Sequence, residues 1–211
     1  MTGRTPGTRG DRDLSVDLPR KPRMVKLPAR PEPIAIDIAR AAIIIVDMQK
    51  DFCAPDGAFA AAGTDVTPNR APIAPLARLL PVLRAAGLPV IWLNWAGTTP
   101  GGPPPQVVSE LAVEPGDLHV EKHGFSGFPD TTLAPLLREL GVQTLLFAGV
   151  NIDEAVLQTL SDAHALGYET LLAEDCASTT NPDFCRLGAI TDIHRLPGFT
   201  LDSAELIDAL R

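Results

Sequence analysis

The sequence of 211 residues has little cysteine, few aromatic residues and no long apolar run. Its three cysteines, Cys53, Cys176 and Cys185, form no CxxC pair and no zinc-like spacing with histidine, which excludes a disulfide framework and a zinc knuckle. No apolar run is long enough to cross a bilayer, and the N-terminus lacks the apolar core of a secretory signal. We therefore expect a soluble cytoplasmic protein with reduced thiols and no membrane partner.

Positive charge is scarce outside the N-terminal segment. The first thirty residues hold eight Lys or Arg against three Asp, with few large apolar groups and no sustained periodicity. Such a stretch buries too little apolar surface to offset the entropy of ordering, so residues 1–33 are predicted to be a basic arm, either flexible or wrapped around another subunit. The formal net charge of −8 leaves −13 for residues 31–211, which contain no Lys or Arg stripe. Nucleic acid is therefore not an expected partner.

Residues 34–211 are predicted to form one domain, because the 45% apolar and 21% charged residues of the full sequence are typical of a globular protein. Two β-branched apolar runs, AAIIIVDMQ (41–49) and LPVIWLNW (88–95), indicate strands buried on both faces. Between them, APLARLLPVLRAAG (74–87) has helical spacing and ends at a glycine.

The alternation of strands and helices continues to the end of the chain. Further strands are predicted over 117–122, 142–150, 168–176 and near 199–200, and further helices over 131–141, 153–166 and 182–193. The fold class is therefore α/β, a three-layer, doubly wound, mostly parallel sheet with helices on both faces. The Gly- and Pro-rich segment AGTTPGGPPPQ (96–106) is predicted to be a long loop that forms a lid or a subunit contact.

Polar residues follow several of these strands. Asp47, Lys122 and the turn at 150–155 each lie at the carboxyl end of a different predicted strand. Ligands of such sheets bind outside the carboxyl ends of the strands, so these residues should meet in one crevice, with Asn94 and Trp95 beside them. Taken singly, Asp47 could cap the next turn and Lys122 could be a solvated edge residue; taken together they indicate proton transfer next to a fixed positive charge.

Three segments carry a family resemblance: IIIVDMQKDF, EKHGFSGF and AGVNIDEAV. In the same order and at similar separations, they resemble the signature segments of the isochorismatase-like cysteine hydrolases, and LAEDCASTT (172–180) is also family-like. The resemblance runs from about residue 34 to the C-terminus and implies the isochorismatase-like, Rossmann-like hydrolase fold. KHGFSGF and VDMQKDFCAPDGAFAAAG are similar to the ureidoacrylate and biuret-type amidohydrolase branch.

The resemblance implies a catalytic Asp-Lys-Cys triad that hydrolyses C–N bonds of small amides, carbamoyl and ureido compounds. The three positions fall on Asp47, Lys122 and Ala155. In such a mechanism the Asp removes the thiol proton, the Lys favours the thiolate, and the thiolate attacks the carbonyl carbon. The resemblance further implies an oxyanion-binding turn at Val150, Asn151 and Ala155, with a cis peptide at Val150–Asn151.

Ala155 departs from this pattern because it has no nucleophilic atom. Three explanations stay open. The alanine is a deliberate Cys→Ala substitution; or the protein is an isochorismatase-type vinyl-ether hydrolase that needs no thiol and uses the Asp as general acid; or it is a natural ligand-binding homologue without catalysis. Ile152, where the family motif has Thr, is a second departure and keeps the last two explanations open.

The residues around the crevice favour a small, flat amide over isochorismate. Isochorismate is a dianion, and no Arg stands at the expected pocket positions to pair with its carboxylates. Each aromatic residue could instead be core packing, which is the commoner role. The predicted substrate contacts are Gln49, Phe52, Asn94, Trp95, Phe125, Phe128, Asn151 and Glu154.

No metal and no organic cofactor is expected. Nicotinamidase-type relatives carry an Asp/His metal cluster after the second strand, and LNWAGTTPGG lacks it. The four histidines are scattered and form no ligand set with a carboxylate: His119, His123, His164 and His194. The partners implied are a small amide or ureido substrate and further copies of the chain, in a homo-oligomer that is a dimer or a tetramer.

Overall fold

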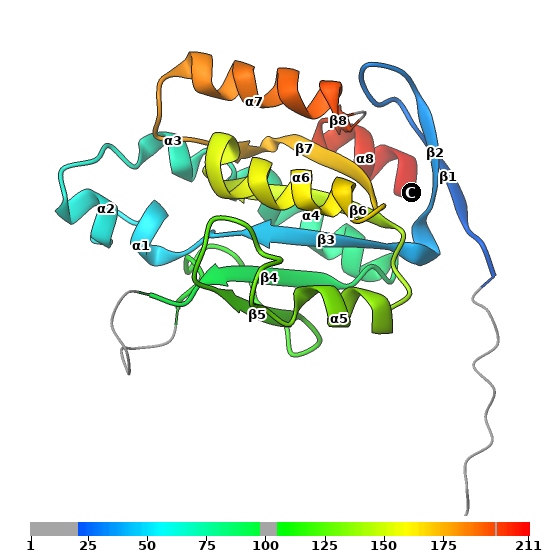
Figure 1. Cartoon of the computed structure of the whole chain (residues 1–211), viewed down its shortest axis with the longest axis horizontal. Helices are drawn as coiled ribbons and strands as arrows, with labels where there is room; N and C mark the ends of the chain where they lie inside the picture. The colour runs from blue at the N-terminus through cyan, green and yellow to red at the C-terminus, as the bar shows by residue number, and fades with distance from the viewer. Residues whose placement is uncertain (1–20, 98–104, 197) are drawn as a thin grey trace, which may run out of the picture.

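The computed structural model of the chain describes residues 21–97, 105–196 and 198–211 (Figure 1). Its centre is a six-stranded sheet in the order β5-β4-β3-β6-β7-β8, in which all neighbouring strands are parallel. This confirms the predicted α/β fold with a parallel sheet. The strands are β3 (Ala41–Val46), β4 (Val90–Trp95), β5 (Leu118–Lys122), β6 (Thr144–Val150), β7 (Glu169–Ser178) and β8 (Phe199–Leu201).

Helices cover both faces of the sheet, so two apolar cores form. Along β3, Ile43 and Ile45 pack into one core while Ile44 and Val46 pack into the other, because successive side chains of a strand point to opposite faces. The first core is closed by α4 (Ile73–Ala85) and α8 (Ser203–Leu210), and the second by α5 (Leu133–Glu139), α6 (Leu157–Ala165) and α7 (Asp183–Arg195). No helix in the described part of the chain is long and apolar enough to span a membrane.

Several short helices lie outside the predicted elements. They are η1 (Ile38–Arg40), α1 (Lys50–Cys53), α2 (Ala58–Ala61) and α3 (Thr67–Arg70). Elements of three or four residues are too short to show a helical period in the sequence. The predicted helix at 153–166 begins with one π-helical turn, η2 (Ile152–Val156), before α6 continues it. The unpredicted α8 begins with a capping box in which Asp202 and Glu205 cap each other's backbone.

The N-terminal segment packs on the domain from residue 24 onward. Strand β1 (Met24–Leu27) pairs antiparallel with β2 (Ile34–Asp37), and Leu27 is buried in the first core. The sequence places residues 24–27 in a basic arm, whereas the structure places them on the domain. A local hairpin partner and one buried leucine supply the ordering that the composition does not reveal. Residues 1–20 of the arm lie outside the described residues.

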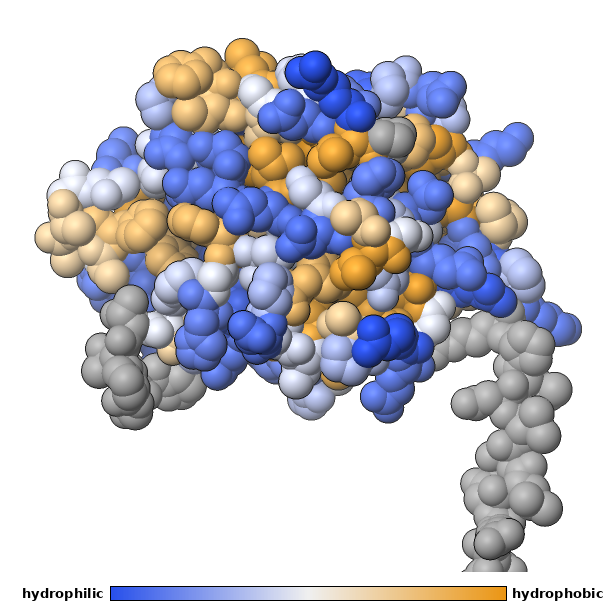
Figure 2. Space-filling model, viewed as in Figure 1, coloured by the Kyte–Doolittle hydropathy of each residue, from blue (hydrophilic) through white to orange (hydrophobic). Residues whose placement is uncertain are grey.

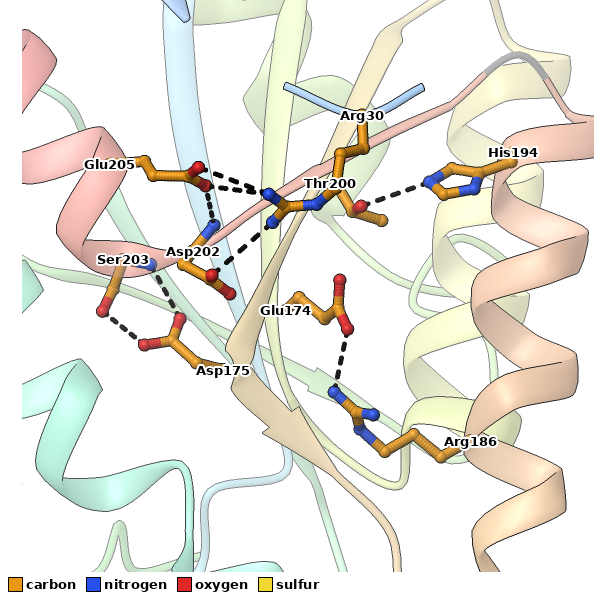
Figure 3. Close-up of polar contacts among 9 residues, drawn as sticks. All are labelled: Arg30, Glu174, Asp175, Arg186, His194, Thr200, Asp202, Ser203 and Glu205. Carbon is orange, nitrogen blue, oxygen red and sulfur yellow. Dashed lines mark hydrogen bonds and ion pairs between the residues drawn. The ribbon is translucent and has the colours of Figure 1, made fainter. Parts of the chain in front are cut away.

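Arg30 ties this segment to the last strand and helix (Figure 3). Its backbone exchanges two hydrogen bonds with Thr200 of β8, at 2.8 and 3.0 Å. Its guanidinium donates to Glu205 at 3.3 Å and lies 3.7 Å from the carboxylate of Asp202. The segment that joins β1 to β2 therefore pairs with the edge strand β8 and contacts the neighbouring helix α8.

The predicted loop at 96–106 follows β4. Its residues 98–104 lie outside the described residues. The predicted role of the loop as a lid or subunit contact depends on these residues and stays a prediction. Where the chain becomes described again, Gln106 accepts a hydrogen bond from the Lys50 amide at 2.8 Å, and Val107 forms a β-bridge with Gln49. The far end of the loop is thus fixed beside α1.

Candidate active site

A pocket of about 520 Å³ opens at the carboxyl ends of β3, β4 and β6, at the end of the sheet that carries α1 and α2 in Figure 1. The order of the strands reverses between β3 and β6, and the crevice of a doubly wound sheet lies at such a switch point. Thirteen residues line the pocket: Asp47, Asp51, Phe52, Ala58, Phe59, Trp95, Ala96, Gly97, Phe125, Val150, Asn151, Glu154 and Ala155.

Asp47 and Lys122 form a buried ion pair at this end. Asp47 follows β3 directly and has a left-handed backbone with φ 52°, a conformation that Asp tolerates better than most residues. Lys122 is the last residue of β5, and its Nζ donates to Asp47 Oδ2 at 2.7 Å. The Lys122 side chain is fully buried and Asp47 is only 5% exposed, so the two charges neutralise each other away from water.

The environment of Asp47 favours a carboxyl group that can take up a proton. Burial raises the pKa of Asp47 to about 6, against the opposing effects of the Lys122 cation and the hydrogen bond from the Trp95 amide. A group with this pKa is readily converted between its two protonation states near neutral pH, as acid-base catalysis requires.

Trp95 is held in place by Gln49 and Asp47. The backbone N–H of Trp95 donates both to Asp47 Oδ1 at 2.9 Å and to Gln49 Oε1 at 2.7 Å, and Gln49 Nε2 donates back to the Trp95 carbonyl at 3.1 Å. The Trp95 ring lies with its centroid 5.0 Å from Lys122 Nζ, in cation–π contact. Gln49 therefore fixes the end of β4 with both ends of its amide.

The turn after β6 brings the backbone of residues 150–155 to the pocket. The Val150–Asn151 peptide is cis, as the resemblance implies. Ala155, the fourth residue of the π-helical turn, lines the pocket and is 3% exposed. Before the turn, Gly149 has φ 114°, and a Cβ at this position would lie 2.0 Å from the Val46 carbonyl oxygen. Only glycine allows β6 to approach β3 so closely here.

A chain of amides orients the polar side chains of this turn. Asn69, which is fully buried in α3, donates to Asn151 Oδ1 at 3.0 Å and to the Phe52 carbonyl at 3.3 Å. Asn151 Nδ2 then donates to Glu154 Oε2 at 2.9 Å, and Asn181 Nδ2 lies 3.3 Å from Glu154 Oε1. The carboxylate of Glu154 is thus held in a fixed position on the pocket wall.

Most of the predicted site residues meet in this pocket, although three of the predicted substrate contacts lie off its wall. Gln49 binds the backbone of Trp95. Asn94 is buried and alternates with Trp95 along β4, so its side chain leaves on the other face of the strand. Phe128 packs against the second core and stacks on Tyr168, with ring centroids 6.4 Å apart. Lys122 contributes through Asp47 and does not line the pocket itself.

Sequence reasoning missed Asp51, Phe59 and Asn69. Asp51 belongs to a segment that already carries the family resemblance, so its position four residues after Asp47, in α1, is the signal that could have found it. Phe59 reaches the pocket from α2 and contacts Phe52 edge to face, with ring centroids 4.9 Å apart. Asn69 lies in α3, which has no sequence signature, and only its contacts in the fold reveal its role.

None of the three cysteines offers a thiolate to this pocket. Burial raises the pKa of Cys53 to about 12 and raises the pKa of Cys176 well above its usual value. The pKa of Cys185 is also raised, by desolvation first and then by the neighbouring Asp153. A thiol must be deprotonated to act as a nucleophile, so the chemistry of the described residues centres on Asp47.

Among residues 21–97, 105–196 and 198–211, no group of three His, Cys, Asp or Glu side chains is arranged to hold a metal ion. The carboxylates on the pocket wall lie next to aromatic and small apolar residues and have no histidine among them. The described residues therefore supply a proton-transfer group, hydrogen-bond acceptors and flat apolar walls.

Comparison with known proteins agrees with this fold. Residues 41–205 match the Isochorismatase domain. A cysteine hydrolase from Pseudomonas syringae pv. phaseolicola is 26% identical, with a TM-score of 0.75 over 90% of this chain and 98% of that one. An isochorismatase family protein from Desulfovibrio vulgaris is 26% identical, with a TM-score of 0.70 over 81% and 98%. N-carbamoylsarcosine amidase from Thermoplasma acidophilum, 24% identical, shares the fold with a TM-score of 0.65 over 78% and 96%. Because the domain match covers most of its length, this chain belongs to the isochorismatase family of hydrolases.

Proposed function

We propose that the pocket is the substrate site of a hydrolase for small carbamoyl, ureido or amide compounds, and that it cleaves their C–N bond when residue 155 carries a thiol. The observation that supports this most directly is the buried Asp47–Lys122 pair, whose carboxylate faces the same pocket as Ala155. The name of the Pseudomonas syringae relative, cysteine hydrolase, agrees with this chemistry. The name of the Thermoplasma acidophilum protein makes N-carbamoylsarcosine a reasonable member of a substrate panel.

With a thiol at residue 155, each step can be assigned. Asp47 takes the thiol proton, and the thiolate attacks the carbonyl carbon of the amide while Lys122 keeps positive charge nearby. Backbone N–H groups of the turn stabilise the tetrahedral oxyanion. The C–N bond then breaks, and the leaving amine takes the proton from Asp47. Finally Asp47 removes a proton from water, which attacks the thioester and releases the acid, and the proton returns to the sulfur.

With Ala155 the same pocket binds the substrate but cannot form the covalent intermediate, because alanine has no nucleophilic atom. Removal of the nucleophile from a comparable covalent hydrolase lowers the rate by on the order of six decades. We therefore expect the chain as it stands to hold an amide substrate without measurable release of ammonia.

The test restores the thiol. The Ala155→Cys variant should release ammonia from members of a panel of ureides and amides that includes N-carbamoylsarcosine and biuret, whereas the unchanged chain and an Ala155→Ser control should not. Asp47→Asn in the Cys background should abolish release. If the Cys variant is folded, as judged by its unfolding transition, and acts on no member of the panel, the proposal is wrong.

A second candidate function needs no thiol. Because burial raises the pKa of Asp47 to about 6, a fraction of this residue is protonated near neutral pH and can act as a general acid in vinyl-ether hydrolysis. Against it stands the pocket wall, whose charged residues are Asp47, Asp51 and Glu154, since these repel a dianion such as isochorismate. Turnover of isochorismate by the unchanged chain would favour this function over amide hydrolysis.

Ligand binding by the unchanged chain, with no turnover by it or by the Cys variant, would instead identify a non-catalytic binding protein. The expected cytoplasmic location and the assembly into a dimer or tetramer stay predictions, and sedimentation of the full chain measures the latter.

A further inference from the structure

The polar side chains on the pocket wall are mostly hydrogen-bond acceptors. Three are carboxylates, Asp47, Asp51 and Glu154, and the other two are the amide of Asn151 and the indole N–H of Trp95. The Asn151 amide is already used at both ends, because its Oδ1 accepts from Asn69 and its Nδ2 donates to Glu154. Carboxylates accept and do not donate when ionised. The side chains of the wall therefore match a ligand that is rich in N–H donors.

The same wall also has an excess of negative charge. Lys122 neutralises Asp47, but no Lys, Arg or His of the described residues forms an ion pair with Asp51 or Glu154. Lys50, the basic neighbour of Asp51 in the sequence, pairs instead with Asp56 at 2.8 Å. The loop sequence TTPGGPP (98–104) contains no charged residue. Two carboxylates thus face the pocket without an ion-pair partner among the described residues.

Flat aromatic side chains make up much of the rest of the wall. Phe52 and Phe59 pack edge to face, Trp95 ends β4, and Phe125 is 50% exposed. Figure 2 shows hydrophobic residues gathered over α1 and α2, the side of the pocket to which Phe59 belongs. Aromatic faces attract cations, and a planar delocalised cation can stack on them while its edges donate to carboxylates.

We propose that the substrate is a small amide or urea that carries a planar cationic group, of the guanidinium or amidinium type, bound by Asp51 and Glu154 between the aromatic walls. This inference rests on the proposed function, because it assigns the non-reacting part of the same substrate. The carbamoyl end of such a compound lies toward Ala155 and Asp47, and the cationic end toward the mouth of the pocket where Asp51 is exposed.

Three compounds that share a carbamoyl group test the proposal: guanylurea (cationic), biuret (neutral) and N-carbamoylglycine (anionic). Guanylurea and biuret have nearly the same shape and differ in one group. Isothermal titration calorimetry on the unchanged full chain at pH 7 measures binding without hydrolysis. Guanylurea should bind at least about tenfold more tightly than biuret, and N-carbamoylglycine should bind most weakly. The advantage of guanylurea should shrink on the order of severalfold between low and high salt, because salt screens charges near the surface.

Two variants and one control locate the effect. Asp51→Asn and Glu154→Gln should each lower the ratio of the biuret Kd to the guanylurea Kd at least about threefold. Asp192→Asn changes the net charge equally but lies on an exposed part of α7 outside the pocket wall, so it should leave the ratio unchanged. Equal affinity for the three compounds, preference for the anion, a ratio that Asp51→Asn and Glu154→Gln do not alter, or failure of guanylurea to bind would each overturn the inference.

The Ala155→Cys variant separates this inference from the proposed function. Ammonia release from biuret and other neutral amides, with no preference for guanylurea, would leave the hydrolase proposal standing and remove the cationic substrate. Cation-selective binding with no ammonia release from any compound would remove the hydrolase proposal and leave a pocket that binds a cationic ligand without cleaving it.

Discussion

At the scale of single residues, the Asp47–Lys122 pair decides what chemistry is available. Burial raises the pKa of Asp47, and the Lys122 cation, together with the hydrogen bond from the Trp95 amide, limits the rise to about 6. The carboxylate form is therefore populated at neutral pH and can still accept a proton there.

The first prediction concerns the pH profile of the Ala155→Cys variant. Because Asp47 must be ionised to take the thiol proton, kcat/KM should rise about tenfold per pH unit below about pH 6 and level off above it. Initial rates across this range of pH, on both sides of the pKa, measure this limb. If Asp47 acts instead as a general acid, the rate falls above about pH 6, so the sign of the slope identifies the role.

The second prediction removes the lysine. The Lys122 cation lowers the pKa of Asp47, so Lys122→Met in the Ala155→Cys background should move the acid limb to higher pH and lower the rate at neutral pH. Lys50→Met is the matched control, since Lys50 is partly exposed and pairs with Asp56 outside the pocket. An acid limb that stays at the same pH in Lys122→Met would mean that another group limits the rate.

At the scale of elements, close approach of β3 and β6 shapes the catalytic turn. Gly149→Ala should destabilise the protein by at least about 2 kcal/mol, because it combines a strained φ of 114° with a clash against the Val46 carbonyl. Gly167→Ala is the control: it has φ 90° and no atom within 4 Å of the added Cβ, so only the strain of about 1 kcal/mol remains. Urea unfolding of both variants gives the difference, and equal losses would show that the clash is relieved elsewhere.

Elements differ in how far the sequence predicts them. The buried strands and the longer helices between them show periods of apolar residues, so their existence follows from the pattern. The helices α1, α2 and α3 span four residues each and carry no period. Strand β1 depends on its partner β2 and on the burial of Leu27, which composition averaged over a basic segment conceals.

The same division holds for the candidate site. Asp47, Lys122 and the turn at 150–155 follow predicted strands directly, so the sequence alone brings them together through the rule that carboxyl ends of parallel strands meet. Gln49 and Asn94 are predicted as substrate contacts, Asn94 because it lies at the carboxyl end of a predicted strand, but Gln49 binds the Trp95 backbone and side-chain alternation turns Asn94 to the other face of β4. Phe59 enters only through packing that no local pattern encodes.

At the scale of the whole molecule, two apolar cores separated by the sheet hold the fold, and the N-terminal hairpin joins the first of them. The hairpin is attached by the buried side chains of Leu27 and Ile36 and by the partly exposed charged contacts of Arg30 (Figure 3). The pocket lies at the opposite end of the sheet, where α1 and α2 are found (Figure 1).

The last prediction separates burial from charge in this attachment. Leu27→Ala should lower the free energy of unfolding by about 2–4 kcal/mol, since the leucine is 1% exposed. Arg30→Ala should cost less than about 1 kcal/mol, because its ion pairs are partly exposed and its backbone bonds to Thr200 remain. Met24→Ala, at a side chain 61% exposed, is the control. A loss at Leu27 no larger than at Met24 would mean that the hairpin is not packed on the domain.

The contact between Arg30 and the last helix also has a consequence for the order of folding. Arg30 and Glu205 are 175 positions apart in the chain, so the partner of the N-terminal hairpin is synthesised long after the hairpin itself. Contacts of such separation form late, because a long loop must close before they contribute. During translation β1 and β2 leave the ribosome well before β8 and α8, so Leu27 lacks its packing against α8 until that helix has emerged.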